Sequence, residues 1–260
     1  MHHDNVIDQG RPFDWGRTST DYATHRPGPP DSLFEQLAMY GVGLLGQRVL
    51  DLGTGTGVMA RGFARLGVRA TGIDIAENQI AEARRPAAEQ GLDIAFDVAP
   101  AETTPFAPAA FDAATANQCW LYFYKPHVLA ELSRVLVLSG LIATSHFSWL
   151  ADDPIAAAME ALVLRFNPTW SSAHSDGQVP TVPEWAAGLA FVGMVAYDVD
   201  VPFTRERWRG RVRACRGVGA SLPDDQVAVF DREYVALLEC IAPERFTVRH
   251  RVDAHVVRLR

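Results

Sequence analysis

The sequence has almost no lysine, few cysteines and no long hydrophobic run. Lys125 is the only lysine, so 23 of the 24 lysine and arginine residues are arginines. The three cysteines, Cys119, Cys215 and Cys240, are odd in number and lack CxxC spacing, which argues against a disulfide framework or a zinc knuckle. No stretch reaches the roughly 18 uninterrupted apolar residues that a membrane span needs. We therefore expect no bound metal, no membrane partner and a reducing environment.

Charge and composition narrow the class of protein further. Of 260 residues, 48% are hydrophobic and 21% are charged, which is ordinary for a globular chain. The formal net charge is −7, which argues against a nucleic-acid partner. The first residues, Met1-His2-His3-Asp4, lack the basic-then-apolar arrangement of a signal peptide. We expect a cytoplasmic protein that is a monomer or a homodimer.

From residue 47 onward, short apolar runs alternate with stretches of helical periodicity. Helices are expected at residues 58–66, 76–90, 128–136, 155–166, 183–190, 204–216 and 223–241. Strands are expected at residues 49–52, 69–75, 94–98, 111–116, 141–146, 192–201 and 246–259. Strands that alternate with helices form right-handed βαβ units around a parallel sheet. The pattern predicts an α/β fold that is Rossmann-like and doubly wound, with a mostly parallel seven-stranded sheet.

Three regions follow from this pattern. Residues 1–30 are a tail and a segment that covers the ligand, residues 31–147 are the ligand-binding core, and residues 148–260 complete the sheet. Within the last region, the stretches at about 148–180 and 204–242 are too long for simple connections. We expect them to form a helical lid over the carboxyl edge of the sheet.

Local signals refine the boundaries of these regions. Residues 1–20 are polar and aperiodic, which predicts a mobile tail, and the prolines between Thr20 and Pro30 exclude a long helix. Asp31 or Ser32 is expected to cap the helix that follows. The residues at 138–141 are expected to form a turn between a helix and the fifth strand.

A glycine turn follows the first expected strand. Gly53, Gly55 and Gly57 alternate with Thr54 and Thr56 directly after this strand. Glycine lets the backbone approach a ligand closely, because it has no Cβ and adopts positive φ freely.

Two residues beside the turn narrow the range of possible ligands. Val58 stands where the third glycine of a dinucleotide-binding turn would be. The Asp51 carboxylate before the turn would repel a pyrophosphate, so a ligand with an ammonium and no phosphate fits better. Asp74, at the end of the second strand, is placed to accept hydrogen bonds from a ribose.

These motifs resemble those of the class I S-adenosylmethionine-dependent methyltransferases. The resemblance rests on residues 49–57, on Gly72-Ile-Asp-Ile-Ala76, and on the strand Phe111-Asp-Ala-Ala-Thr-Ala-Asn117. Tyr22-Ala-Thr-His-Arg26-Pro27 resembles the Tyr-x-x-x-Arg-Pro segment of the small-molecule, type 11-like branch. The similarity is strong over residues 18–147 and implies that S-adenosylmethionine is the cofactor and S-adenosylhomocysteine the product.

The resemblance also implies roles for individual residues. The glycine turn, with Thr54 and Asp51, would flank the methionine and ribose portions of the cofactor, and Asp74 would bind the ribose diol. The other cofactor contacts that it implies are Tyr22 and Arg26 closing over the cofactor, Ile75 on the adenine, Ala101 and Glu102 at the adenine edge, and Asn117 and Gln118 at the methionine end. Many relatives carry an aspartate where this chain has Pro100, and Asp97 lies three residues too early to replace it.

Residues just past the fourth and fifth strands are expected to face the methyl group that is transferred. His146 is the best candidate for a general base by its position, and Trp120 is expected beside it. His25 is a weaker candidate, as is His174. Each histidine also has a structural interpretation, as a side chain at the end of a strand or in a loop.

The acceptor side is marked by aromatic and arginine side chains. Six aromatic residues gather beside the expected lid, which suggests an apolar or aromatic acceptor or cation–π support for the sulfonium. They are Trp120, Tyr122, Phe123, Tyr124, Trp149 and Trp170. Six arginines lie between Arg205 and Arg216, either on a solvated helix face or at an anionic acceptor.

The predicted function is methylation of a small molecule in secondary metabolism, with oxygen slightly favoured as the acceptor atom. Methylation of carbon, in an aromatic ring or a prenyl diphosphate, is the main alternative. An NAD-dependent oxidoreductase and a non-catalytic cofactor-binding protein remain open as further alternatives.

Overall fold

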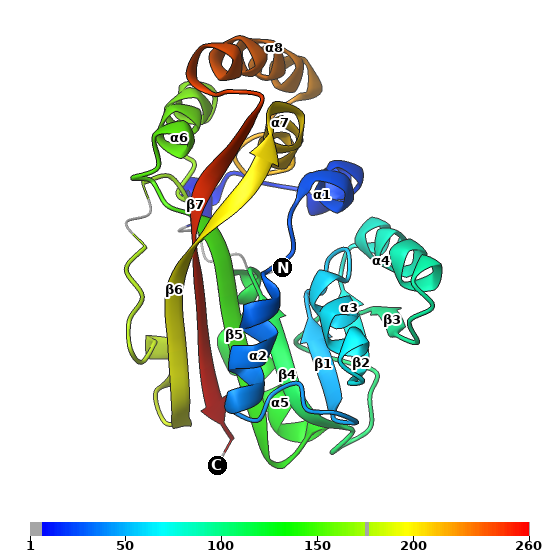
Figure 1. The fold of residues 1–260 in the computed structure, drawn as a ribbon. Coiled ribbons are helices and arrows are strands. Elements are labelled where there is room, and N and C mark those ends of the chain that lie inside the picture. The colour runs from blue at the N-terminus through cyan, green and yellow to red at the C-terminus, as the bar shows by residue number, and fades with distance from the viewer. Residues whose placement is uncertain (1–6, 175–176, 260) are drawn as a thin grey trace.

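The computed structural model describes residues 7–174 and 177–259, and one sheet runs through them (Figure 1). Its seven strands lie in the order β3-β2-β1-β4-β5-β7-β6. The strands from β1 to β5 pair in parallel, whereas β7 is antiparallel to both β5 and β6. The predicted Rossmann-like, mostly parallel seven-stranded sheet is therefore confirmed. The strands are β1 (Arg48–Leu52), β2 (Arg69–Asp74), β3 (Ala95–Val98), β4 (Phe111–Asn117), β5 (Leu136–Trp149), β6 (Ala190–Thr204) and β7 (Arg245–Arg258).

Helices cover both faces of the sheet. Successive side chains of a strand point to opposite faces, so the apolar side chains on each face need a layer of helices to bury them. Val49 of β1 packs in one apolar cluster with α2, α3 and α4, and Leu50 packs in the other with α5. The α-helices in the described residues are α1 (Ser19–His25), α2 (Asp31–Met39), α3 (Val58–Arg65), α4 (Glu77–Glu89), α5 (Lys125–Val135), α6 (Pro154–Phe166), α7 (Arg205–Arg213) and α8 (Asp224–Ile241).

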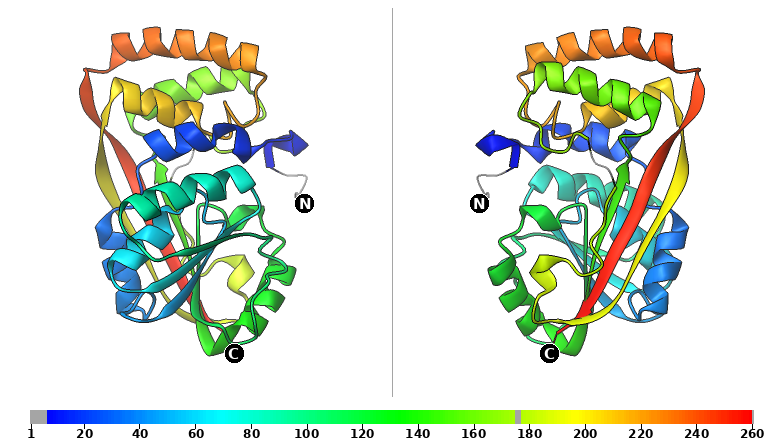
Figure 2. Two further views of the ribbon diagram at one scale, coloured as in Figure 1. Left: turned by 90° about the vertical axis from the view of Figure 1, so that its right-hand side faces the viewer. Right: turned by 90° about the vertical axis from the view of Figure 1, so that its left-hand side faces the viewer.

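Helices α6, α7 and α8 form a layer of their own, which we call the lid, above the carboxyl ends of the parallel strands (Figures 1 and 2). The dark blue α1 lies between this layer and the sheet in both views of Figure 2. The long strands β6 and β7 rise into the lid, and α7 and α8 connect them. Trp208 of α7 is fully buried against Phe203 of β6 and Trp149 of β5. The lid thus shares the apolar cluster of one face of the sheet.

The N-terminal segment is ordered and packs under the lid. Residues 7–10 and 15–18 form 3₁₀ turns, and the backbone N–H of Asp14 donates to the carbonyl of Ala220 over 2.9 Å. Arg17 donates to the carbonyl of Leu222 over 3.1 Å. The prediction of a mobile tail is therefore wrong for residues 7–20, because contacts with distant parts of the chain compensate for the missing local periodicity. Residues 1–6 of that predicted tail lie outside the described residues.

Two predicted boundaries on the helical side need correction. Neither Asp31 nor Ser32 caps α2, because Pro30 occupies the N-cap position and makes no side-chain cap. The predicted helix at 183–190 reduces to a 3₁₀ turn at Glu184–Ala186, and Gly188 then adopts a φ of +87° before β6 begins. The exclusion of a long helix before residue 30 is confirmed, since α1 ends at His25.

The turn predicted at 138–141 lies inside β5, which begins directly after α5, at Leu136. Ser139 adopts a φ of +64°, and the pairing of β4 with β5 shifts register between Phe111 and Ala113. The local turn chemistry is therefore present, but it produces an irregularity in a strand rather than the end of a helix.

Gly57 allows α3 to pack closely on the sheet. It has a φ of +72°, and a Cβ there would lie 2.8 Å from Cζ of Phe96. We expect Gly57→Ala to lower the free energy of unfolding by about 2–4 kcal/mol, from left-handed backbone strain and from overpacking. Gly55→Ala is the matched control, because its φ of +56° is similar but the nearest atom to its Cβ is 3.8 Å away. Urea unfolding checks this, and equal losses in both variants would contradict the packing role.

Candidate active site

The glycine turn between β1 and α3 has the backbone shape that the sequence predicts. Gly53, Gly55 and Gly57 all have positive φ, between +55° and +72°. A Cβ on Gly53 would lie 2.9 Å from the sulfur of Cys119, so no larger residue fits there. A Cβ on Gly55 would point into open space, with only Gln79 Oε1 within 4 Å. The turn therefore exposes backbone at the edge of a cavity.

The carboxylate of Asp51 ties this turn to the sheet. It is 1% exposed and accepts hydrogen bonds from the hydroxyls of Thr54, over 2.6 Å, and Thr115, over 2.8 Å. Burial raises the pKa of Asp51 to about 6, and these two hydrogen bonds act against the rise. The chain keeps a carboxylate here at an energetic cost, which points to a positively charged ligand group.

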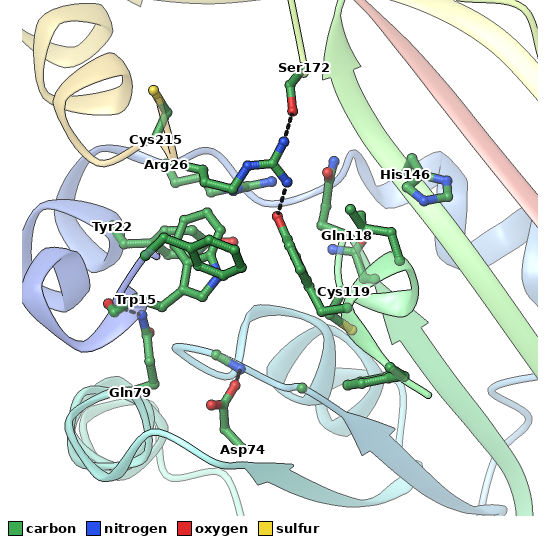
Figure 3. A pocket seen from close by; sticks show the side chains of 18 of the residues that line it. Trp15, Tyr22, Arg26, Asp74, Gln79, Gln118, Cys119, His146, Ser172 and Cys215 are labelled. Atoms are coloured by element: carbon green, nitrogen blue, oxygen red, sulfur yellow. Dashed lines mark hydrogen bonds between the residues drawn. The ribbon is translucent and has the colours of Figure 1, made fainter. Parts of the chain in front are cut away.

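Asp74 stands at the end of the neighbouring strand and faces the same turn (Figure 3). One of its oxygens accepts from the backbone N–H of Gly55 and the other from that of Ala76, both over 2.9 Å. Burial raises the pKa of Asp74, and these backbone hydrogen bonds oppose the rise. The carboxylate is therefore fixed in orientation, and it lines the cavity.

A cavity of about 550 Å³ lies between the sheet edge and the lid. Its size is typical of a site for a small organic ligand. In Figure 3, Asp74 lies on the sheet side, Trp15 and Tyr22 come from the N-terminal segment, and Ser172 and Cys215 come from the lid side. The cavity thus needs three parts of the chain that are far apart in sequence.

Most of the residues expected at the cofactor do line this cavity, although their contacts with a cofactor stay predictions. They are Tyr22, Arg26, Gly53, Gly55, Asp74, Ile75, Ala101, Glu102, Asn117 and Gln118. Asp51 and Thr54 instead line a small adjoining pocket of about 40 Å³ behind the turn. Gly57 packs against Phe96 and lines neither pocket. Gly57 therefore serves helix packing, and its expected place beside the cofactor stays a prediction.

Two of the expected catalytic residues lie outside the cavity lining, and their catalytic roles stay predictions. Trp120 is 3% exposed and packs on Trp185 in the core below β4, away from the cavity lining. The ring of His25 packs against Gly210 of α7, and its Nε2 lies 3.9 Å from Asp21. Trp120 lies in a 3₁₀ turn and His25 lies in α1. The packing of these elements sets the direction of both side chains, and the sequence alone does not reveal it.

His146 does reach the cavity, and it has a partner that sequence reasoning missed. Its Nδ1 lies 3.0 Å from Oδ1 of Asp253, a residue of β7 that is 7% exposed. The two residues are direct partners in the antiparallel pairing of β5 with β7. No signal in the sequence identifies this pair, because 107 residues separate its members. His174 instead lies in a loop, where its backbone N–H donates to Glu160.

The arginine run from Arg205 to Arg216 divides into two groups. Arg209 pairs with Asp231, and Arg213 pairs with Asp21, so these side chains tie α7 to α8 and α1. Arg211 and Arg216 are 5% and 4% exposed and line the cavity. The run is therefore neither a solvated helix face throughout nor a ligand-binding face throughout.

Part of the aromatic lining was expected, and part comes from the N-terminal segment, whose role the sequence did not reveal. Phe13 and Trp15 of the N-terminal segment line the cavity beside Tyr122, with ring centroids 5.5 Å and 5.9 Å from its ring. Trp149 and Trp170 line it on the lid side, with centroids 6.3 Å apart. The cavity therefore has aromatic walls on two sides.

Two absences hold for residues 7–174 and 177–259. No group of three or more histidine, cysteine, aspartate or glutamate side chains is arranged to hold a metal ion. In the same residues, no helix has both the length and the apolar character to cross a membrane.

The fold and the site define a Rossmann-like protein with an aromatic-lined cavity at the carboxyl ends of its parallel strands. A family model described as a methyltransferase domain matches residues 49–140. The ubiquinone biosynthesis O-methyltransferase of Xylella fastidiosa is 30% identical over 175 residues, covering 66% of this chain and 70% of that protein. The protein of that name from Xanthomonas euvesicatoria is 29% identical over 175 residues, covering 65% and 71%. A solved structure titled as a putative type II methyltransferase from Anaeromyxobacter dehalogenans has the same fold, with a TM-score of 0.59 at 22% identity over 90% of this chain and 97% of that chain.

The chain belongs to the class I S-adenosylmethionine-dependent methyltransferases. It is therefore an enzyme, and S-adenosylmethionine is its methyl donor. This membership rules out the two alternative functions, a nicotinamide-dependent oxidoreductase and a non-catalytic cofactor-binding protein.

The residues around the turn fit this donor. Among the described residues, the buried Thr56 Oγ1 and Gln79 Oε1 have no hydrogen-bond partner, and both belong to side chains at the glycine turn. Gly55 leaves a space beside Gln79 that a side chain would fill. Unpaired buried polar atoms beside such a space are typical of a site for a polar ligand.

Asp51 should make the stability of the ligand-free protein depend on pH. Its native-state pKa of about 6 lies above the usual 3.8, so its contribution to stability is lost as the pH rises from about 4 through about 6. We expect Asp51→Asn to raise the free energy of unfolding by about 1–3 kcal/mol near pH 8, with a smaller effect near pH 5. Urea unfolding at both pH values checks this. A gain of equal size at both would contradict the titration of Asp51.

Proposed function

We propose that this methyltransferase transfers the methyl group to a hydroxyl oxygen of a small molecule with an aromatic or apolar body. The observation that carries the proposal is the pairing of His146 with Asp253 at the wall of the cavity. A hydroxyl acceptor must lose a proton during methyl transfer, and a paired imidazole is suited to take it.

The carboxylate of Asp253 fixes the orientation and the tautomer of His146. With an N–H at Nδ1 donating to Oδ1 of Asp253 over 3.0 Å, Nε2 is the nitrogen assigned to receive the acceptor's proton. Asp253 also stabilises the positive charge that develops on the imidazole. It acts as a positioning residue, because it reaches the acceptor through His146.

The remaining residues bind, orient and exclude water. Asp74 is placed to accept hydrogen bonds from the ribose of the donor, and the Asp51 carboxylate behind the turn favours its ammonium. Arg26, whose guanidinium lies 4.6 Å from the ring centroid of Tyr22, is suited to its carboxylate. When bound, S-adenosylmethionine supplies a methyl group on a sulfonium, and the aromatic walls keep water away from it.

The names of the relatives support oxygen as the acceptor atom. The two curated proteins described above are called O-methyltransferases of ubiquinone biosynthesis. The aromatic lining supports a ring-bearing acceptor, and we place the reaction in small-molecule biosynthesis on these grounds.

Turnover with a panel of catechols and phenols tests the proposal. We expect the wild type to add one methyl group to a hydroxyl, detected by mass spectrometry and located by NMR. His146→Ala should lower kcat by about 10²–10⁴-fold, because the general base is lost. Asp253→Asn should lower kcat by about tenfold or more, because it removes the charge and not the hydrogen bond.

Cofactor affinity and an unrelated histidine provide the controls. Both variants should bind S-adenosylhomocysteine within about twofold of the wild type, since neither residue lies at the glycine turn. His127→Ala, an exposed site on α5, should keep wild-type turnover. Full activity of His146→Ala would remove it as the base, and a methyl group on carbon would overturn the assignment of oxygen.

Asp74 should govern cofactor affinity. We expect Asp74→Ala to weaken the binding of S-adenosylhomocysteine by about 10–100-fold, because hydrogen bonds to a charged group contribute about 1.5–3 kcal/mol. Calorimetric titration measures this. The matched control is Asp97→Ala, an exposed carboxylate on β3 that lies outside the cavity lining. Unchanged affinity in Asp74→Ala would contradict the assignment of Asp74 to the ribose.

A further inference from the structure

Arg211 is a buried charge that forms no ion pair with a described residue. It lies on α7, is 5% exposed and lines the cavity. Its guanidinium lies 4.7 Å from the ring centroid of Trp149, and its Nε is buried without a hydrogen-bond partner. Within the described residues it makes no ion pair. Burial, followed by the charge of Arg26, lowers the pKa of Arg211 to about 9. A buried, unpaired cation is costly to maintain, so it needs a functional reason.

Three other arginines of α7 have partners within the protein. Arg209 and Arg213 pair with aspartates, and Arg205 donates to the carbonyl of Ala242. Arg216 also lines the cavity, but its Nε lies 2.8 Å from Asp8 and its other nitrogens donate to nearby hydroxyls, including that of Tyr122. The positive charge of Arg216 is therefore balanced within the protein. Among residues 7–174 and 177–259, no acidic side chain pairs with Arg211.

The donor has one carboxylate, whereas two arginines without an ion-pair partner among the described residues line the cavity. Arg26 and Arg211 both line it, and neither makes an ion pair with a described residue. S-adenosylmethionine has a single carboxylate, which the proposed function assigns to Arg26. An anion on the acceptor is the remaining partner for Arg211.

The walls beside Arg211 indicate what carries that anion. Trp149 and Trp170 are 8% and 4% exposed and line the same cavity as His146 and Ser148. Because Arg211, the two tryptophans and His146 line one cavity, an aromatic acceptor there has a guanidinium and a candidate base among its walls. A single guanidinium stacked on an aromatic ring suits a planar carboxylate, which it binds with two parallel hydrogen bonds.

We propose, resting on the proposed function, that the acceptor is an aromatic carboxylic acid whose carboxylate binds Arg211 while its hydroxyl faces His146. Arg211 then selects the acceptor, and it binds no part of the methyl donor. The carboxylate also removes the cost of the unpaired charge, so the acceptor completes the electrostatics of the cavity.

Equilibrium binding separates this inference from turnover. The protein is saturated with S-adenosylhomocysteine and titrated with protocatechuate and caffeate, and then with the neutral amide of each. We expect the carboxylates to bind the wild type at least about tenfold more tightly than the amides. Arg211→Met should abolish this preference, and Arg211→Lys should retain part of it. The matched control is Arg207→Met, an exposed arginine of the same helix, which should keep the full preference.

Stability distinguishes lost binding from lost folding. Without ligand, Arg211→Met should have a higher thermal midpoint than the wild type, because an unpaired buried charge is replaced by an apolar side chain. A lower midpoint would mean that the fold itself uses the charge, and it would overturn the inference. S-adenosylhomocysteine should bind all three variants within about twofold of the wild type. Weaker binding in Arg211→Met alone would assign Arg211 to the cofactor instead.

Further outcomes decide the class of acceptor. Equal binding of acid and amide to the wild type, or no binding of either, overturns the inference, even if neutral phenols are methylated and the proposed function stands. Tighter binding of phenyl phosphate than of benzoate, dependent on Arg211, would make the anion a phosphate and overturn the carboxylate. Binding of the acids through Arg211 without methylation of any hydroxyl would instead count against the proposed function.

Discussion

The buried carboxylate of Asp51 is the constraint on which the site depends. It holds the hydroxyls of Thr54 in the turn and of Thr115 in β4, so one side chain joins two neighbouring strands to the glycine loop. The loop in turn presents the N–H of Gly55 to Asp74 at the end of β2. Three strand ends are thereby held in register at the edge where parallel strands place a ligand. Burial makes the charge costly, and in the proposed function the ammonium of the donor would offset that cost.

The cavity exists because a second layer covers this edge. Strands β6 and β7 extend beyond the parallel strands and hold α7 and α8 above them (Figure 1). Trp208 and Phe230 of these helices belong to the same apolar cluster as α2 and α3, so the lid is part of the core. Asp8 of the N-terminal segment forms an ion pair with Arg216, which links this segment to the lid. The sheet, the lid and the N-terminal segment are therefore all needed to enclose the cavity.

Charge divides the cavity into two ends. Asp74, which ends β2, and Glu102, which follows β3, line one part of it, whereas Arg211 of α7 and Arg216 just after α7 line the part on the lid side. The acidic end is complementary to a donor that carries a sulfonium and an ammonium, and the basic end to an anionic acceptor. Such a division orients two ligands toward each other, which matters in a reaction where positioning supplies much of the rate.

The sequence by itself determined the features that depend on near neighbours. Strand and helix alternation, the glycine turn and Asp74 were predictable, because periodicity and glycine chemistry act over a few residues. The order of the N-terminal segment, the partner of His146 and the isolation of Arg211 were not. They arise from contacts across long separations, 107 residues for His146 with Asp253 and 208 for Arg216 with Asp8. Only tertiary packing brings such groups together, and only packing decides which arginine of a helix is left without a partner.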